Sequence, residues 1–121
     1  MRDQDLAGSE FEDCNLTGTR FTNINLSGAR FHDINFSDVL FTAAQIGGTT
    51  FRHIGPPPDP KGIRQRQRAV TFEDGVLCDS VFRRMDLTNA KLVDCDLGGM
   101  TIDGIPVTDA LREWEERHAR P

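Results

Sequence analysis

The sequence predicts an all-β fold built from short extended segments joined by regular corners, and three observations predict it. A large apolar residue recurs at every fifth position from Leu6 to Phe51. A small or apolar residue lies two places before most of them, and a turn-forming residue lies two places after many. A five-residue period matches neither the helical stripe of 3.6 residues nor the two-residue alternation of a strand. Two inward positions in five therefore describe an extended piece followed by a corner.

The first block of repeats covers residues 4–53 and holds ten units. Its large residues are Leu6, Phe11, Leu16, Phe21, Leu26, Phe31, Phe36, Phe41, Ile46 and Phe51. Its corners are expected at residue types that tolerate or stabilise turns. These are Gly8, Asp13, Gly18, Asn23, Gly28, Asp33 and Asp38. We expect the large side chains to point inward and to form the buried core.

Three segments are close copies of one unit: Cys14-Asn15-Leu16-Thr17-Gly18, Ile24-Asn25-Leu26-Ser27-Gly28 and Met85-Asp86-Leu87-Thr88-Asn89. In these units the chain resembles the pentapeptide-repeat family, whose unit is roughly alanine, aspartate or asparagine, leucine or phenylalanine, and two variable residues. The resemblance implies a right-handed quadrilateral β-helix, in which four units make one square coil. Eighteen units would make about 4.5 stacked coils, spaced by about 4.8 Å as neighbouring strands are.

A long insertion divides the repeats of this predicted single domain, residues 1–121. Four prolines between positions 56 and 60 remove backbone donors that a neighbouring coil would need, so a loop is expected at 54–69. The second block, 70–107, has large residues Phe72, Leu77, Phe82, Leu87, Leu92, Leu97, Ile102 and Val107. If the loop takes the place of one face, Phe72 stacks over Phe41 and Leu77 over Ile46.

Residues 108–119 read as a short helix. Thr108 is a suitable N-cap, and Asp109 lies where the helix dipole favours a negative charge. Leu111 and Trp114 share one face of this helix. The pattern favours a cap over the open end of the repeats. The alternative is a dimer contact, because the resemblance includes topoisomerase-directed proteins that dimerise through their C-terminal ends. The chain is thus expected to be a monomer or a homodimer.

The three cysteines, Cys14, Cys78 and Cys95, suggest neither a disulfide framework nor a zinc cluster. Cys14 and Cys95 occupy the small inward position of their units, so we expect them to be buried. Cys78 falls at an outward position and should be accessible.

Charge is distributed unevenly over the chain, whose net charge is −5. Residues 1–51 and 70–107 hold fourteen acids against six bases, whereas residues 52–69 hold one acid against five bases. The loop residues Lys61, Arg64, Arg66 and Arg68 are therefore the candidate partner-binding residues. They suit an acidic partner, a phosphate or a nucleic acid. The alternative is that the run is solvated or lies against the acids of the repeats.

The function expected from these features is that of a non-catalytic, bacterial-type scaffold that binds an unidentified protein, without cofactor or metal. The aspartate or asparagine before each large residue is expected to face outward or to hydrogen-bond a neighbouring turn, and a continuous core leaves no substrate cavity. The resemblance implies an alternative, a DNA mimic that inhibits or protects DNA gyrase or topoisomerase. Direct nucleic-acid binding is disfavoured by the net charge. The absence of a long apolar run or a secretory signal predicts a cytoplasmic protein.

Overall fold

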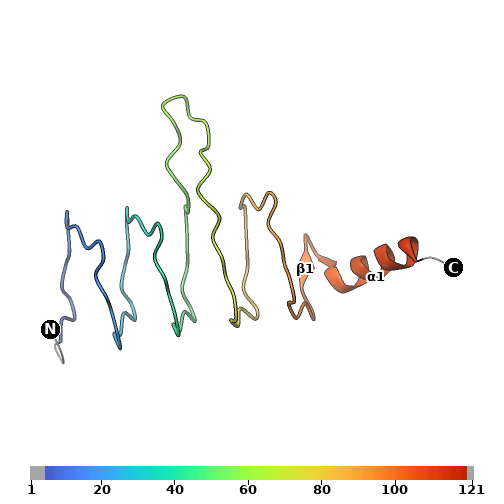
Figure 1. The fold of residues 1–121 in the computed structure, drawn as a ribbon, viewed down its shortest axis with the longest axis horizontal. Coiled ribbons are helices and arrows are strands. Elements are labelled where there is room, and N and C mark those ends of the chain that lie inside the picture. The colour runs from blue at the N-terminus through green and yellow to red at the C-terminus, as the bar shows by residue number, and fades with distance from the viewer. Residues whose placement is uncertain (1–4, 120–121) are drawn as a thin grey trace. The chain divides into compact units, whose positions relative to one another are not determined.

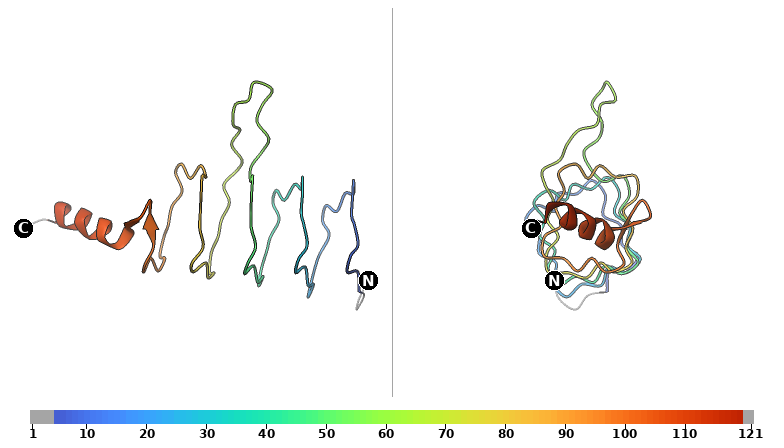
Figure 2. Two further views of the ribbon diagram at one scale, coloured as in Figure 1. Left: turned by 180° about the vertical axis from the view of Figure 1, so that it is seen from behind. Right: turned by 90° about the vertical axis from the view of Figure 1, so that its right-hand side faces the viewer.

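The computed structural model describes residues 5–119 and divides the chain into two compact units. Unit 1 ends at Ile54, and unit 2 begins at Gly55. The described part of unit 1 has neither helix nor strand. Unit 2 contains strand β1 (Thr101–Ile102), strand β2 (Ile105–Pro106) and helix α1 (Val107–His118). Within unit 1, coloured blue to green, the chain runs back and forth in limbs that reverse at regular corners (Figures 1 and 2).

The corners predicted from the sequence are present. All seven named corner residues have a positive φ, from 50° at Asp13 to 77° at Gly8. The same conformation recurs every five residues from Gly8 to His53 and again from Asp74 to Gly99. Because the left-handed region is open mainly to Gly, Asn and Asp, the corner residues fix where each limb ends. The predicted five-residue backbone period is therefore confirmed.

The corners are of two kinds, which alternate along the chain. In one kind, the N–H three residues after the large residue donates a bond of 2.9–3.2 Å to its carbonyl. A positive φ at the third residue alone makes this a type II turn. These turn units have the large residues Leu6, Leu16, Leu26, Phe36, Ile46, Leu77, Leu87 and Leu97. The intervening bend units have Phe11, Phe21, Phe31, Phe41, Phe51, Phe72, Phe82 and Leu92, and within residues 5–119 no such bond closes their corners.

Side-chain amides and carboxylates support the turn units. In six of the eight, the Oδ1 atom of the residue before the large one accepts the N–H two residues on, at 2.9–3.0 Å. The acceptors are Asp5, Asn15, Asn25, Asn35, Asp86 and Asp96. Bend units have no Asp or Asn at this position. The expected hydrogen bonding of these residues to a turn is confirmed. Because turn units and bend units of five residues alternate, the structural repeat is ten residues long.

The expected burial of the large residues is wrong for this structure. The rings of Phe31, Phe36 and Phe41 meet edge to face, with centroids 5.6 and 5.8 Å apart, so consecutive large side chains do converge. Phe31 is nevertheless 56% exposed, and no residue is buried among those described. The reason is that, within the described part of each unit, the backbone bonds of the repeats are local and do not join one coil to the next. The converging rings are therefore left uncovered.

The exposure of the cysteines has the same cause. Cys14, Cys78 and Cys95 are all free thiols and all exposed. The accessibility of Cys78 is confirmed, whereas the expected burial of Cys14 and Cys95 is wrong. The thiols of these two donate to backbone carbonyls two residues earlier, at 3.0 and 3.3 Å. Each of these two thiols is thus bonded within its own repeat.

The loop stands between two bend units. The corner before it, at His53, and the first corner after it, at Asp74, both belong to bend units. Since the two kinds alternate elsewhere, the loop occupies the place of a turn unit. The stacking of Phe72 over Phe41 joins residues of different units, and it stays a prediction.

The repeats end in a hairpin that the sequence analysis missed. β1 and β2 pair antiparallel, with Ile102 opposite Ile105, around Asp103 and Gly104. Both turn residues have a positive φ, 48° and 78°, which defines a type I′ turn. An Asp-Gly pair between apolar residues is the strongest short-range signal for this hairpin, so the sequence did contain the information.

Helix α1 begins one residue earlier than predicted. Val107 opens the helix and is not the last large residue of the repeats, and Pro106 occupies the N-cap position without a side-chain hydrogen bond. The prediction of Thr108 as N-cap is therefore wrong, because the chain already becomes helical directly after β2. Asp109 lies in the first turn, as predicted. Among residues 5–119 no helix is long and apolar enough to span a bilayer.

Candidate functional site

The loop has a closed tip built around Asp59. The Asp59 carboxylate Oδ1 accepts the backbone N–H groups of Lys61 and Ile63 at 2.9 and 2.8 Å. Two backbone bonds reinforce the closure, from Asp59 N–H to the Ile63 carbonyl and from Gly62 N–H to the Asp59 carbonyl. The positive φ of 81° at Gly62 permits this tight path. The only acid of the loop is therefore occupied in holding its tip, which leaves the charge of the tip to Lys61.

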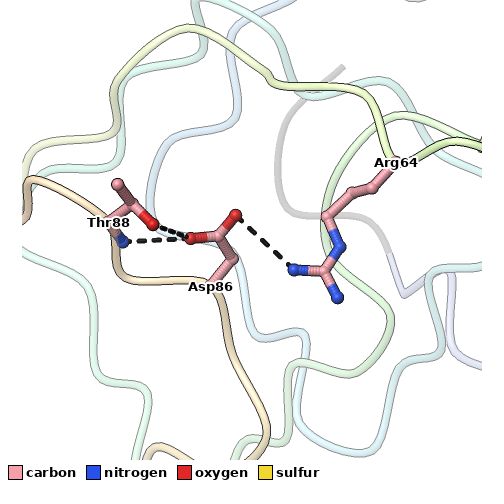
Figure 3. A network of polar contacts seen from close by, with 3 residues as sticks. All are labelled: Arg64, Asp86 and Thr88. Atoms are coloured by element: carbon pink, nitrogen blue, oxygen red, sulfur yellow. Dashed lines mark hydrogen bonds and ion pairs between the residues drawn. The ribbon is translucent and has the colours of Figure 1, made fainter.

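Arg64 connects the loop to the second block of repeats. Its Nη1 atom lies 3.5 Å from the Oδ2 atom of Asp86 (Figure 3). The other carboxylate oxygen of Asp86 accepts the Thr88 hydroxyl at 2.6 Å and the Thr88 backbone N–H at 3.0 Å. Asp86 thus serves two functions, since one oxygen supports its own turn unit and the other pairs with the loop.

The electrostatic state of Asp86 reflects these contacts. The hydrogen bonds from the Thr88 hydroxyl and backbone N–H, and then the Arg64 guanidinium, hold the pKa of the Asp86 carboxyl below its usual value of 3.8. A carboxylate stabilised in this way stays ionised through the neutral range. Both partners remain accessible to water, with the Arg64 side chain 75% and the Asp86 side chain 36% exposed. The pair is consequently a weak, screened contact.

The four predicted basic residues differ in their surroundings. Lys61 lies at the tip, and Arg66 lies beyond Arg64 on the limb that returns to the repeats. Neither the Lys61 ammonium nor the Arg66 guanidinium has an ion-pair partner among residues 5–119. Arg68 follows on the same limb and is itself engaged. The structure therefore ties Arg64 to an acid of the repeats and leaves Lys61 and Arg66 to solvent.

The predicted C-terminal contact residues lie exposed on α1. Leu111 is 47% and Trp114 is 59% exposed. The Trp114 indole stacks on the His118 ring, with centroids 4.2 Å apart, and the His118 Nδ1 atom lies 2.7 Å from the Trp114 carbonyl. Both contacts therefore join residues of the same helix. The roles of Leu111 and Trp114 as cap or dimer contact stay predictions.

Two shallow hollows lie on unit 2. One is lined by Ala69, Val70, Thr71, Phe72, Asn89, Ala90 and Lys91, and the other by Ala110, Glu113, Trp114, Arg117 and His118. The first has only one titratable side chain, the Lys91 ammonium. In the second, Arg117 pairs with Glu113 at 2.6 Å. Neither hollow contains a pair of carboxylates, and no group of metal-ligating side chains occurs among residues 5–119.

Sequence reasoning missed Asp59 and Asp86 as the residues that order the loop. Pro-Asp-Pro-Lys-Gly is a turn-forming composition and could have indicated the closed tip. Asp86 had no distinguishing signal, because the same position is Asp or Asn in five other turn units. Only the spatial approach of Arg64 sets it apart.

These observations define a repeat protein with a five-residue unit and a ten-residue structural period. A family model described as "Pentapeptide repeats (9 copies)" matches residues 1–40. The match confirms the family that the sequence resembles. No curated protein and no solved structure matches the sequence.

Proposed function

We propose that this chain is a non-catalytic binding scaffold, whose repeats close into a right-handed quadrilateral β-helix and whose loop engages an acidic protein partner. The observation that carries the proposal is the regular backbone, in which a left-handed corner returns every five residues in both blocks. Such a backbone displays side chains at fixed intervals. This is the property by which repeat proteins offer extended binding surfaces.

We expect the coils to close because the open arrangement is energetically unfavourable in two ways. Within residues 5–119, the limbs leave backbone N–H and C=O groups without protein partners, and the converging rings of Phe31, Phe36 and Phe41 remain in water. Stacking one coil on the next would pair the backbone groups as in a sheet. It would also cover the rings, and each buried phenylalanine contributes about 1.5–3 kcal/mol. The eight turn units and eight bend units would then form about four coils.

The loop supplies the charge contrast for a partner. The repeats hold an excess of acids, whereas residues 52–69 hold five bases and one acid. The Asp59 carboxylate is already bonded to backbone N–H groups, and Lys61 and Arg66 face solvent without an ion pair within residues 5–119. An acidic protein surface complements this arrangement, because opposite potentials steer association.

The test is affinity capture from a bacterial lysate with three forms of the chain. The wild type is compared with Lys61→Glu/Arg66→Glu and with Arg20→Glu/Arg30→Glu, which makes the same charge change in unit 1. We expect one acidic protein to be captured by the wild type and by the unit 1 variant, and to be lost from the loop variant. Equal capture by all three forms, or by none, would contradict the assignment of binding to the loop.

A second function, a DNA mimic acting on gyrase or topoisomerase, is favoured by the acid excess of the repeats. This function requires a surface of regularly spaced negative charge. Asp86 and Asp96 provide a local example, since both carboxylates are fixed by backbone hydrogen bonds at positions ten residues apart. A supercoiling assay with purified gyrase tests this function. Unchanged gyrase activity at a large excess of the chain would exclude it.

A further inference from the structure

Asp86 differs from its equivalents in one respect. Six turn units have an Asp or Asn whose Oδ1 atom accepts the N–H two residues on. An amide does this as well as a carboxylate, since Asn15, Asn25 and Asn35 form the same bond. The turn therefore does not require a negative charge at position 86. The charge has a separate consequence, which is the ion pair of its second oxygen with Arg64.

The loop is preshaped for that contact. The Asp59 carboxylate closes the tip through Ile63, the residue directly before Arg64, and the Gln65 side-chain amide donates to the Ile63 carbonyl at 3.0 Å. The backbone on both sides of Arg64 is thus held by short-range bonds. Less conformational freedom is lost when the guanidinium meets Asp86 than in an unstructured loop.

We infer that the loop is a strap, which the Arg64–Asp86 pair fastens to the second block of repeats and which opens to release Arg64. A pair this exposed is weak, and added salt weakens it further. The closed and open forms therefore differ little in free energy. Opening releases the Arg64 guanidinium from Asp86, so that Arg64 becomes available to a partner together with Lys61 and Arg66.

The strap has a consequence for binding, which rests on the proposed function. One guanidinium cannot pair fully with Asp86 and with the carboxylates of a partner, so the repeats and an acidic partner compete for Arg64. Closure lowers the apparent affinity for the partner by the fraction of loops that are closed. The second block thus acts as an internal competitor for the loop.

Limited trypsin digestion tests the strap, because trypsin cleaves after the lysine and arginine residues of the loop. The full chain at 50 mM NaCl is compared with Asp86→Asn, Arg64→Gln and the double variant, and cleavage after Arg66 is followed by mass spectrometry. We expect each single variant to be cleaved about 2- to 5-fold faster, as the loss of one exposed pair implies. The double variant should be no faster than either single variant, because both remove the same contact.

Asp96→Asn is the matched control. Asp96 occupies the equivalent position ten residues on and accepts the Gly98 N–H at 3.0 Å. Its change should leave the cleavage rate as in the wild type. Equal rates for Asp86→Asn and the wild type, or equal acceleration by Asp96→Asn, would overturn the strap. At 500 mM NaCl, the wild type should approach the rate of Asp86→Asn, and a salt-independent difference would also overturn it.

Fluorescent poly-L-glutamate tests the competition separately. We expect Asp86→Asn to bind this probe more tightly than the wild type, by the same 2- to 5-fold factor. Equal binding to the two forms overturns the competition while the digestion result stands. Binding to neither form overturns the acidic-partner proposal, and the strap is still decided by trypsin.

Discussion

The repeats and the loop at 54–69 are ordered by different kinds of contact. In the repeats, each corner is set by a left-handed residue, and the alternate corners add a bond spanning three residues. The loop closes its tip in the same local way around Asp59, but it is fastened by Arg64 to a residue 22 positions later. The repeats therefore depend on residue type at each position. The Arg64–Asp86 contact of the loop depends on charge instead, and changes in the two regions should differ in size accordingly.

The largest effect is expected from the converging rings. Phe36 contacts both Phe31 and Phe41, so Phe36→Ala should destabilise the proposed closed repeats by about 3–5 kcal/mol. The measurement is urea unfolding followed by circular dichroism. The control is Leu40→Ala, since Leu40 is 83% exposed and should contribute little. Equal losses for the two variants would contradict a core made by the large positions.

A smaller effect is expected from the corner conformation. Gly28 has a φ of 77°, and apart from Gly28 and its two chain neighbours no atom lies within 4 Å of the place that an alanine methyl group would take. Gly28→Ala should therefore cost about 1–2 kcal/mol through backbone strain alone. Ala43 has a φ of 53° and already bears this strain, so Ala43→Gly should stabilise the chain by up to about 1 kcal/mol. Thermal unfolding of both variants checks the opposite signs. Two shifts of the same sign would contradict the assignment of these residues to the same conformation.

The side-chain hydrogen bonds of the turn units should contribute less to the free energy of unfolding than the corner conformation does. Asn25→Ala removes the acceptor of the Ser27 N–H, and the expected loss is about 0.5–1.5 kcal/mol. Asn25→Asp keeps an acceptor, as Asp96 does in its own unit, and should be close to neutral. Urea unfolding separates the two. If Asn25→Asp were as destabilising as Asn25→Ala, the hydrogen bond would not be the cause.

The smallest effect on stability, and the clearest effect on the loop, is expected from acidification. The native pKa of Asp86 is below 3.8, so its contribution is fully present above that value and is lost as the pH falls through the lower native value. Protection of the loop amides in the wild-type protein, taken relative to the exchange rate of an unstructured chain at the same pH, should therefore fall only below about pH 4. Asp86→Asn should show no such step. A step in that variant, or one near neutral pH, would assign the titration to another group.

The sequence allowed the prediction of features that depend on single residue types. Gly18 and Asn23 mark corners because few other residues tolerate a positive φ, and Asp109 suits the first turn of a helix wherever that helix begins. The start of α1 was less predictable, since the Asp103–Gly104 hairpin immediately before it was overlooked. Ala43 was not recognisable as a corner residue, because nothing in its residue type favours that conformation.

The candidate site was predictable in composition but not in contacts. The basic run from Lys61 to Arg68 is evident in the sequence, and one of the two alternatives was that it lies against the acids of the repeats. Arg64 does so. Which acid it meets could not be predicted, because Asp86 and Asp96 are alike in sequence and only the three-dimensional path of the loop distinguishes them. A resemblance based on the repeat unit provides no information on an inserted loop.

Hydrogen exchange of the backbone amides of the repeats tests the central claim most directly. The claim is that the corners direct the limbs into stacked coils, in which amides now without partners bond to the neighbouring coil. In the wild-type chain at neutral pH, we predict slow exchange for amides flanking the large residues, such as those around Phe31 and Phe36, and fast exchange for the loop. Uniformly fast exchange across both blocks would show that the coils stay open, and would contradict the proposed β-helix.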